Sequence, residues 1–171
     1  YYLAIWAGFK RKVALALGLV AIFLSGYMLP KTDTLKITFL DVGQGDCAVI
    51  ELPNEKVWVV DGGGVKGSDW DIGRYVVAPY LWENGIHHVD LLFLSHPHHD
   101  HYKGLGFLAQ NFSPKILYTN GDDAPESEGG EWQNFLKQVR EKKIPLQKVT
   151  IKTPPVKEGD VTLSFLAPGA S

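Results

Sequence analysis

Apolar residues recur with two different periods along this chain, and these periods divide it into short strands and helices. Apolar residues at every second position predict strands, and apolar residues three or four positions apart predict helices. In the helix expected at 71–84, Pro79 should divide the helix or begin a second one, and Gly85 should end the helical segment. We expect strands at 36–42, 48–51, 57–60, 90–95, 116–118, 146–151 and 161–166, and helices at 71–84, 104–111 and 131–143. Helices alternating with strands after an initial β-meander indicate an α/β fold.

The first thirty residues have a different composition from the rest. Val13–Leu29 holds 17 residues without a charge. A helix of that length would cover about 26 Å, close to the thickness of a bilayer's hydrocarbon core. Lys10–Lys12 precedes this run and Pro30 ends it, which predicts a cytoplasmic start and an extracytoplasmic remainder. We therefore interpret 1–30 as a membrane segment with its last transmembrane helix at 13–29; a signal peptide or anchor and a buried core helix are the alternatives.

Charge also changes at this boundary. All 19 acidic residues lie at or after Asp33, whereas three of the 17 basic residues lie in Lys10–Lys12. Residues 31–171, which we interpret as a separate domain, hold 14 basic and 19 acidic residues, a formal charge of −5. A free-standing DNA-binding domain is normally basic, so this domain should contact DNA only weakly and through bound cations.

The segment Ser-His-Pro-His-His-Asp-His, which starts at residue 95, follows a predicted strand and concentrates imidazole and carboxylate groups. Both are common ligands of divalent metal ions. On an extended chain His96 and His98 point to the same side and could bind one ion together. Asp100 falls on that side as well, and with His101 it could bind a second ion. This pattern predicts two divalent ions, zinc or manganese; the alternative is a histidine-rich surface loop with incidental metal affinity.

The pattern His96-x-His98-x-Asp100-His101 resembles the signature of the metallo-β-lactamase superfamily. Two further motifs narrow the resemblance: Leu40-Asp-Val-Gly-Gln-Gly-Asp46 and Val59-Val-Asp-Gly-Gly-Gly64. Together they resemble the C-terminal metallo-β-lactamase-like domain of ComEC-type competence proteins, which are membrane channels of bacterial DNA uptake. The resemblance implies an αββα sandwich, of which this chain should hold the N-terminal half, and a multi-pass protein of the bacterial cell membrane.

The resemblance also implies roles for individual carboxylates. Asp100 would bind metal and, as a second possibility, orient or deprotonate the attacking water. Asp61 would position the ligand loop without binding metal, or would simply be a turn residue. Asp46 would lie near the metals or touch substrate; alternatively, Asp41 and Asp46 accept backbone hydrogen bonds in a tight glycine turn.

Several other residues are weaker candidates. Cys47 is the single cysteine, so an intrachain disulfide is impossible, and the apolar residues that follow it favour a place in the core. His99 has the opposite parity to His96 and should point away from the metals. Lys103 and Arg74 are possible phosphate contacts, and the residues that line a substrate groove cannot be identified from the sequence.

The superfamily completes its site with a histidine, a bridging aspartate and a last histidine after the first motif, but this chain has no histidine after His101. We therefore expect the chain to be incomplete at its C-terminus and weakly active by itself. The residues by themselves indicate metal-assisted hydrolysis, and the resemblance implies a metal-dependent nuclease that degrades the DNA strand not transported during transformation. Its partners would be DNA, the membrane and other competence proteins. The alternatives are a non-catalytic cap that guides DNA to the channel, and a hydrolase of small esters, thioesters or lactams.

Overall fold

A computed structural model describes residues 12–21 and 34–166 of the chain. The chain divides into two compact units, Tyr1–Thr32 and Asp33–Ser171. In the first unit, residues 12–21 form a helix with exposed side chains.

The membrane span expected at 13–29 is not supported. Within the two described ranges, no helix combines the length and the apolar content that crossing a bilayer requires. Part of the predicted span, 22–29, lies outside the described residues, and so does the apolar run 1–9 before it.

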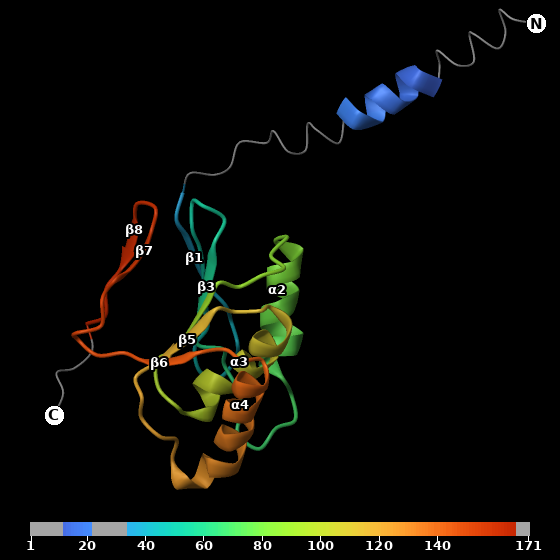
Figure 1. The fold of residues 1–171 in the computed structure, drawn as a ribbon. Helices are drawn as coiled ribbons and strands as arrows, with labels where there is room; N and C mark the ends of the chain where they lie inside the picture. Colours follow the sequence, from blue (N-terminus) through green and yellow to red (C-terminus); the bar gives the residue numbers. More distant parts are fainter. Residues whose placement is uncertain (1–11, 22–33, 167–171) are drawn as a thin grey trace, which may run out of the picture. The chain divides into compact units, whose positions relative to one another are not determined.

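Six strands of the second unit form one mixed sheet, and their order in the sheet follows their order in the chain. The first three pair antiparallel, as a β-meander requires, and the last three pairings are parallel, each bridged by a helical crossover (Figure 1). The strands are β1 (Lys36–Phe39), β2 (Ala48–Glu51), β3 (Val57–Val60), β4 (Leu91–Leu94), β5 (Ile116–Thr119) and β6 (Leu146–Lys148).

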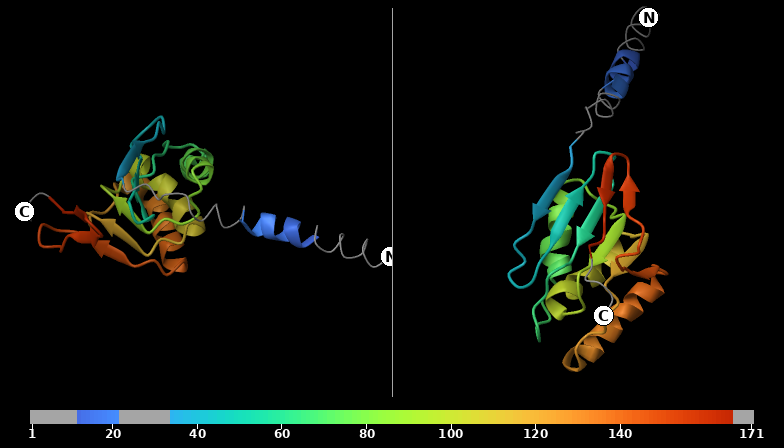
Figure 2. Two further views of the ribbon diagram at one scale, coloured as in Figure 1. Left: turned by 90° about the horizontal axis from the view of Figure 1, so that it is seen from above. Right: turned by 90° about the vertical axis from the view of Figure 1, so that its left-hand side faces the viewer.

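The crossover helices cover one face of this sheet (Figures 1 and 2). The main core lies between the helices and the sheet, where Val59 and Leu92 of the sheet and Leu105 and Leu108 of the helix at 99–111 are fully buried. Each such side chain contributes about 1.5–3 kcal/mol through removal of apolar surface from water. The helices are η1 (Gly73–Val77, a π-helical turn), α2 (Ala78–Glu83), α3 (His99–Asn111), η2 (Glu126–Glu128, a 3₁₀ turn) and α4 (Gly129–Glu141).

The opposite face of the sheet carries a second apolar cluster, which a short hairpin covers. Strands β7 (Val156–Glu158) and β8 (Val161–Leu163) form this hairpin. Phe165, which follows it, places its ring 5.5 Å from that of Tyr118 and 6.3 Å from that of Phe93, measured between centroids. An ion pair between Lys56 and Glu158 ties the hairpin to the turn before β3.

The structure confirms the α/β class and the expected strands, with two differences of substance. The helix expected at 104–111 begins at His99, five residues earlier, so the second half of the histidine segment is helical. Strand β7 was not predicted, because its Val-Lys-Glu sequence has no run of apolar alternation. The division of the 71–84 helix at Pro79 is confirmed, since a π-helical turn meets α2 directly before it.

Asp90, directly before β4, anchors the end of the sheet away from the histidines. Its buried carboxylate accepts hydrogen bonds from the Val57 amide at 3.1 Å and from the Lys115 ammonium at 2.8 Å. Burial alone raises the pKa of Asp90, but the hydrogen bonds from Lys115 and Val57 outweigh it and hold that pKa below its ordinary value. A carboxyl with a lowered pKa stabilises the fold above the unfolded-state pKa of about 3.9, and this contribution is lost as the pH falls through the folded-state pKa.

We predict that Asp90→Asn lowers the free energy of unfolding at pH 7 by about 1–3 kcal/mol, because two donors lose a charged acceptor. Urea unfolding at pH 7 and at pH 3 measures this, and the difference from the wild type should narrow at pH 3, which lies below the unfolded-state pKa of about 3.9, because the carboxylate's contribution decreases there. Asp160→Asn, at an exposed position in the hairpin turn, is the control and should leave stability unchanged. Equal stability of the Asp90 variant and the wild type at pH 7 would contradict the prediction.

Candidate metal centre

The histidine segment lies at the carboxyl end of β4, where the chain passes from strand to helix. His98 is still extended, with φ −97° and ψ 148°, and α3 begins at the next residue. The predicted alternation therefore holds only as far as His98. Asp100 and His101 lie in the first turn of α3, so helical geometry, and not strand parity, brings them beside the other two histidines. His99 is buried, with 9% of its surface exposed.

Three imidazole rings gather at this point. The ring centroid of His96 lies 4.7 Å from that of His98 and 3.9 Å from that of His101. The Oδ1 atom of Asp100 lies 3.9 Å from Nε2 of His101. Burial, followed by the charges of His101 and His98, lowers the pKa of His96, which favours the neutral imidazole that binds metals.

A buried carboxylate, that of Asp61, contacts this cluster through Ser95 and His101. Asp61, 4% exposed, follows β3 in the left-handed region at φ 57°. Its Oδ1 accepts the Ser95 amide hydrogen at 2.8 Å, and its Oδ2 accepts the Ser95 hydroxyl hydrogen at 2.6 Å. Oδ2 also lies 3.0 Å from Nδ1 of His101. These contacts fit the positioning role expected of Asp61, because an imidazole held through Nδ1 presents its Nε2 lone pair to a metal.

Glycine loops pack against the first turn of α3 at distances that a side chain would block. A Cβ atom on Gly45 would lie 1.7 Å from the carbonyl oxygen of Asp100, and one on Gly64 would lie 2.2 Å from that of His99. The loops are joined to each other as well, because the Gly63 amide donates to the carbonyl of Asp46 at 3.0 Å. The loop 41–46 thus packs directly against the first turn of α3, which carries the candidate ligands Asp100 and His101.

The two aspartates of that motif differ. Oδ1 of Asp41 accepts the Gly43 amide hydrogen at 3.0 Å, as expected of a glycine turn. Asp46 is exposed, and among the described residues its carboxylate accepts no hydrogen bond. A role for Asp46 near metal or substrate stays a prediction.

The four candidate ligands lie near one another. The ring of His96 lies 4.7 Å from that of His98 and 3.9 Å from that of His101, and Asp100 lies beside His101. The expected division of these residues between two ions stays a prediction. In the described part of the chain, however, no three histidine, cysteine, aspartate or glutamate side chains are arranged to hold one ion. His96, His98, Asp100 and His101 are nevertheless residue types that bind divalent metal ions, so the chemistry of the donor set fits such a site.

Comparison with known proteins agrees with this geometry. The family model of the metallo-beta-lactamase superfamily matches residues 40–168. This chain belongs to the metallo-beta-lactamase superfamily. It is also similar to ComE operon protein 3 of Bacillus subtilis (strain 168), with 26% identity over 137 residues that cover 74% of this chain and 16% of that protein. The resemblance to a ComEC-type metallo-β-lactamase-like domain is thus confirmed. Members of this superfamily are generally hydrolases and typically bind divalent metals such as zinc.

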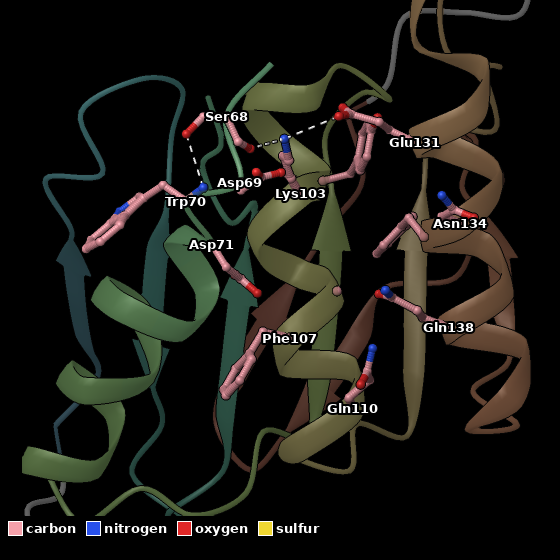
Figure 3. Close-up of a pocket in the computed structure, with 13 residues that line it drawn as sticks. Ser68, Asp69, Trp70, Asp71, Lys103, Phe107, Gln110, Glu131, Asn134 and Gln138 are labelled. Atoms are coloured by element: carbon pink, nitrogen blue, oxygen red, sulfur yellow. Dashed lines mark hydrogen bonds and ion pairs between the residues drawn. The ribbon is translucent and has the colours of Figure 1, made fainter. Parts of the chain in front are cut away.

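A cavity of about 350 Å³ lies apart from the superfamily's histidine motif, between α3, α4 and the loop 66–71 (Figure 3). The ammonium group of Lys103 points to its edge, where it donates to the carbonyls of Ser68 at 2.8 Å and Val65 at 3.2 Å and lies 3.4 Å from Glu131. Lys103 is therefore engaged within the protein, which does not support its expected role as a phosphate contact.

The structure also places Arg74 and Cys47, two other residues that the sequence left as weak candidates. The Arg74 guanidinium lies 5.3 Å from the centroid of the Tyr75 ring, over its face. Cys47 is 2% exposed and belongs to the main core, in agreement with the expected core role. Ser95 was missed, although its place directly before the histidine motif was a visible signal.

The thiol of Cys47 should be inert in the folded protein. Burial, followed by the negative charge of Asp61, raises its pKa to about 12, and the thiolate is the reactive form. We predict no labelling by iodoacetamide at pH 8 over hours, and complete labelling in 6 M guanidinium chloride, as measured by intact mass. Rapid labelling of the native protein would show that the thiol is accessible.

Gly45→Ala should disturb the metal site, and Gly43→Ala is its matched control. Both glycines have positive φ, 81° and 74°, so both substitutions carry a similar backbone strain of about 1 kcal/mol. Only Gly45 faces the Asp100 carbonyl, whereas nothing lies within 4 Å of a Cβ on Gly43. We expect Gly45→Ala to weaken zinc binding by about 10–100-fold relative to Gly43→Ala, measured by calorimetric titration. Equal affinities would contradict this.

Proposed function

We propose that this domain is a metal-dependent phosphodiesterase that cuts DNA, and that in a competence system it degrades the strand that is not taken up. The supporting observation is the gathering of three imidazoles and a carboxylate at the end of β4, above a buried aspartate, in a chain of a generally hydrolytic superfamily. The similarity to a ComE operon protein supports the competence setting.

The proposed chemistry divides the ligands between two ions. His96 and His98 would hold one divalent ion, and Asp100 and His101 the other, with zinc or manganese as the candidates. Bound metal of this kind lowers the pKa of a water ligand to about 7 and neutralises charge on a phosphodiester. The second oxygen of Asp100, on a half-buried side chain, would orient the water for attack. His101 would be kept in place through its Nδ1 contact with Asp61.

The charge of the domain bears on how DNA would reach this site. Residues 31–171 have a formal charge of −5, so attraction to phosphate would come from bound cations and from neighbouring parts of the full-length protein. We propose that residues 1–30 belong to the membrane part of such a protein, and that the hydrolase domain lies on the extracytoplasmic side. DNA, the membrane and other competence proteins would then be its partners.

A second candidate is a non-catalytic cap that guides DNA to the channel. The described residues hold no group of three side chains arranged to bind one ion, and a metal site without further ligands would favour the non-catalytic cap. The two candidates differ in whether hydrolysis accompanies uptake.

The test is the double variant His96→Ala/Asp100→Ala of the full-length protein. It removes one ligand from each pair, and we expect hydrolysis of linear DNA to fall at least about 1,000-fold, because metal-activated water would be lost. A gel assay with zinc, manganese or magnesium measures cutting, and nitrocefin and a thioester identify other substrates. Circular dichroism checks folding.

His87→Ala is the control, because this exposed histidine lies outside the motif and should leave cutting unchanged. Undiminished DNA cutting by the double variant would refute the assignment. DNA uptake at wild-type levels, with no hydrolysis by either protein, would support the cap instead.

A further inference from the structure

Ser95 lies where three functional side chains meet. Its hydroxyl oxygen is 2.6 Å from Oδ2 of Asp61, 3.0 Å from Nδ1 of His96 and 3.4 Å from Nδ1 of His101. Its amide is held separately, by Oδ1 of Asp61 at 2.8 Å. The backbone and the side chain of Ser95 therefore make independent contacts with the same carboxylate.

The hydrogen atoms of this group can be assigned by counting donors. A serine hydroxyl has one hydrogen, and an ionised carboxylate can only accept. The contact of 2.6 Å therefore places the hydroxyl hydrogen between Ser95 and Asp61, which leaves the Ser95 oxygen as an acceptor. The neighbour at 3.0 Å, Nδ1 of His96, must then be the donor.

The same counting applies to His101. Its Nδ1 lies 3.0 Å from Oδ2 of Asp61 and 3.4 Å from the Ser95 hydroxyl, and both of these oxygens can accept its hydrogen. A neutral imidazole carries its hydrogen on one ring nitrogen only. With Nδ1 protonated, both His96 and His101 present an Nε2 lone pair, and that is the nitrogen left for a metal.

We infer that Ser95 is a positioning residue that extends the influence of Asp61 to His96 and fixes the Nδ1–H tautomer of that ring. This inference rests on the proposed metal-dependent function. Asp61 reaches His101 directly but reaches His96 only through the Ser95 hydroxyl, so a single carboxylate sets the tautomers of one ligand from each pair. The rings of His96 and His101, 3.9 Å apart, are thereby aligned as metal ligands before any ion binds.

Ser95→Ala isolates this role, because the amide contact with Asp61 does not need the side chain. Ser95→Thr retains a hydroxyl and serves as the conservative variant. Ser127→Ala removes a hydroxyl from an exposed position in η2 and serves as the control. The full-length protein is labelled with ¹⁵N in histidine and kept free of metal, at a pH of about 8, where imidazole is neutral.

Two-bond ¹H–¹⁵N correlation spectra report the tautomer of each ring. We expect Nδ1–H for His96 and His101 in the wild type, in Ser95→Thr and in Ser127→Ala. In Ser95→Ala, His96 should become a mixture of tautomers, whereas His101 should keep Nδ1–H through Asp61. Calorimetric titration with zinc should show affinity about 10–100-fold weaker for Ser95→Ala and near-normal affinity for Ser95→Thr.

An unchanged His96 tautomer in Ser95→Ala would overturn the inference, and so would an Nε2–H tautomer of His96 in the wild type. A changed tautomer without any loss of zinc affinity would overturn the positioning role. The tautomer spectra need neither metal nor turnover. If they match expectation while the double variant still cuts DNA, the proposed function fails and the tautomer assignment stands.

Discussion

The candidate site depends on one buried charge, the carboxylate of Asp61. A carboxylate with 4% exposure is costly to bury unless hydrogen-bond donors compensate for the lost water, and here three donors contact it. The amide and hydroxyl of Ser95 and the ring of His101 supply those donors. Because the carboxylate requires these partners, it draws the ends of β3 and β4 and the start of α3 to one point.

Close backbone packing is the second condition for the site. Asp61 leaves β3 with positive φ, and the glycines after it allow the chain to pass directly beneath α3. Gly62 and Gly104 illustrate the contact, because a Cβ on Gly104 would lie 2.0 Å from the carbonyl oxygen of Gly62. The glycine loops therefore determine how deeply the helix sits, and the helix in turn carries Asp100 and His101.

Most of the sheet could be predicted from the sequence, because each strand has a distinct local pattern. β4 is a continuous apolar run and β3 is another, which is typical of strands buried on both faces. The start of α3 could not be predicted in the same way. Histidine is a weak helix former, and the spacing of His96 and His98 also fits an extended chain.

The site was only partly predictable for a related reason. The identity of the candidate ligands follows from a contiguous motif, but their orientation depends on residues far away in the chain. Ser95 and Asp61 are 34 positions apart, and His101 and Asp61 are 40 apart. No local periodicity records such a pairing. Strand β7 of the hairpin was missed because its sequence has no alternation of apolar and polar residues. Its apolar side chain is partly buried against the second cluster, on the face of the sheet opposite the helices.

These long separations have a consequence for the order of events during synthesis. The parallel pairing of β3 with β4 closes a loop that contains η1 and α2, and closing it has an entropic cost that only tertiary packing can offset. Until that loop is closed, a nascent polypeptide displays its histidines without the carboxylate that aligns them. The alignment of His96 and His101 by Asp61 therefore exists only after β3 and β4 have paired, so the arranged candidate ligands are a product of folding and not of the contiguous motif alone.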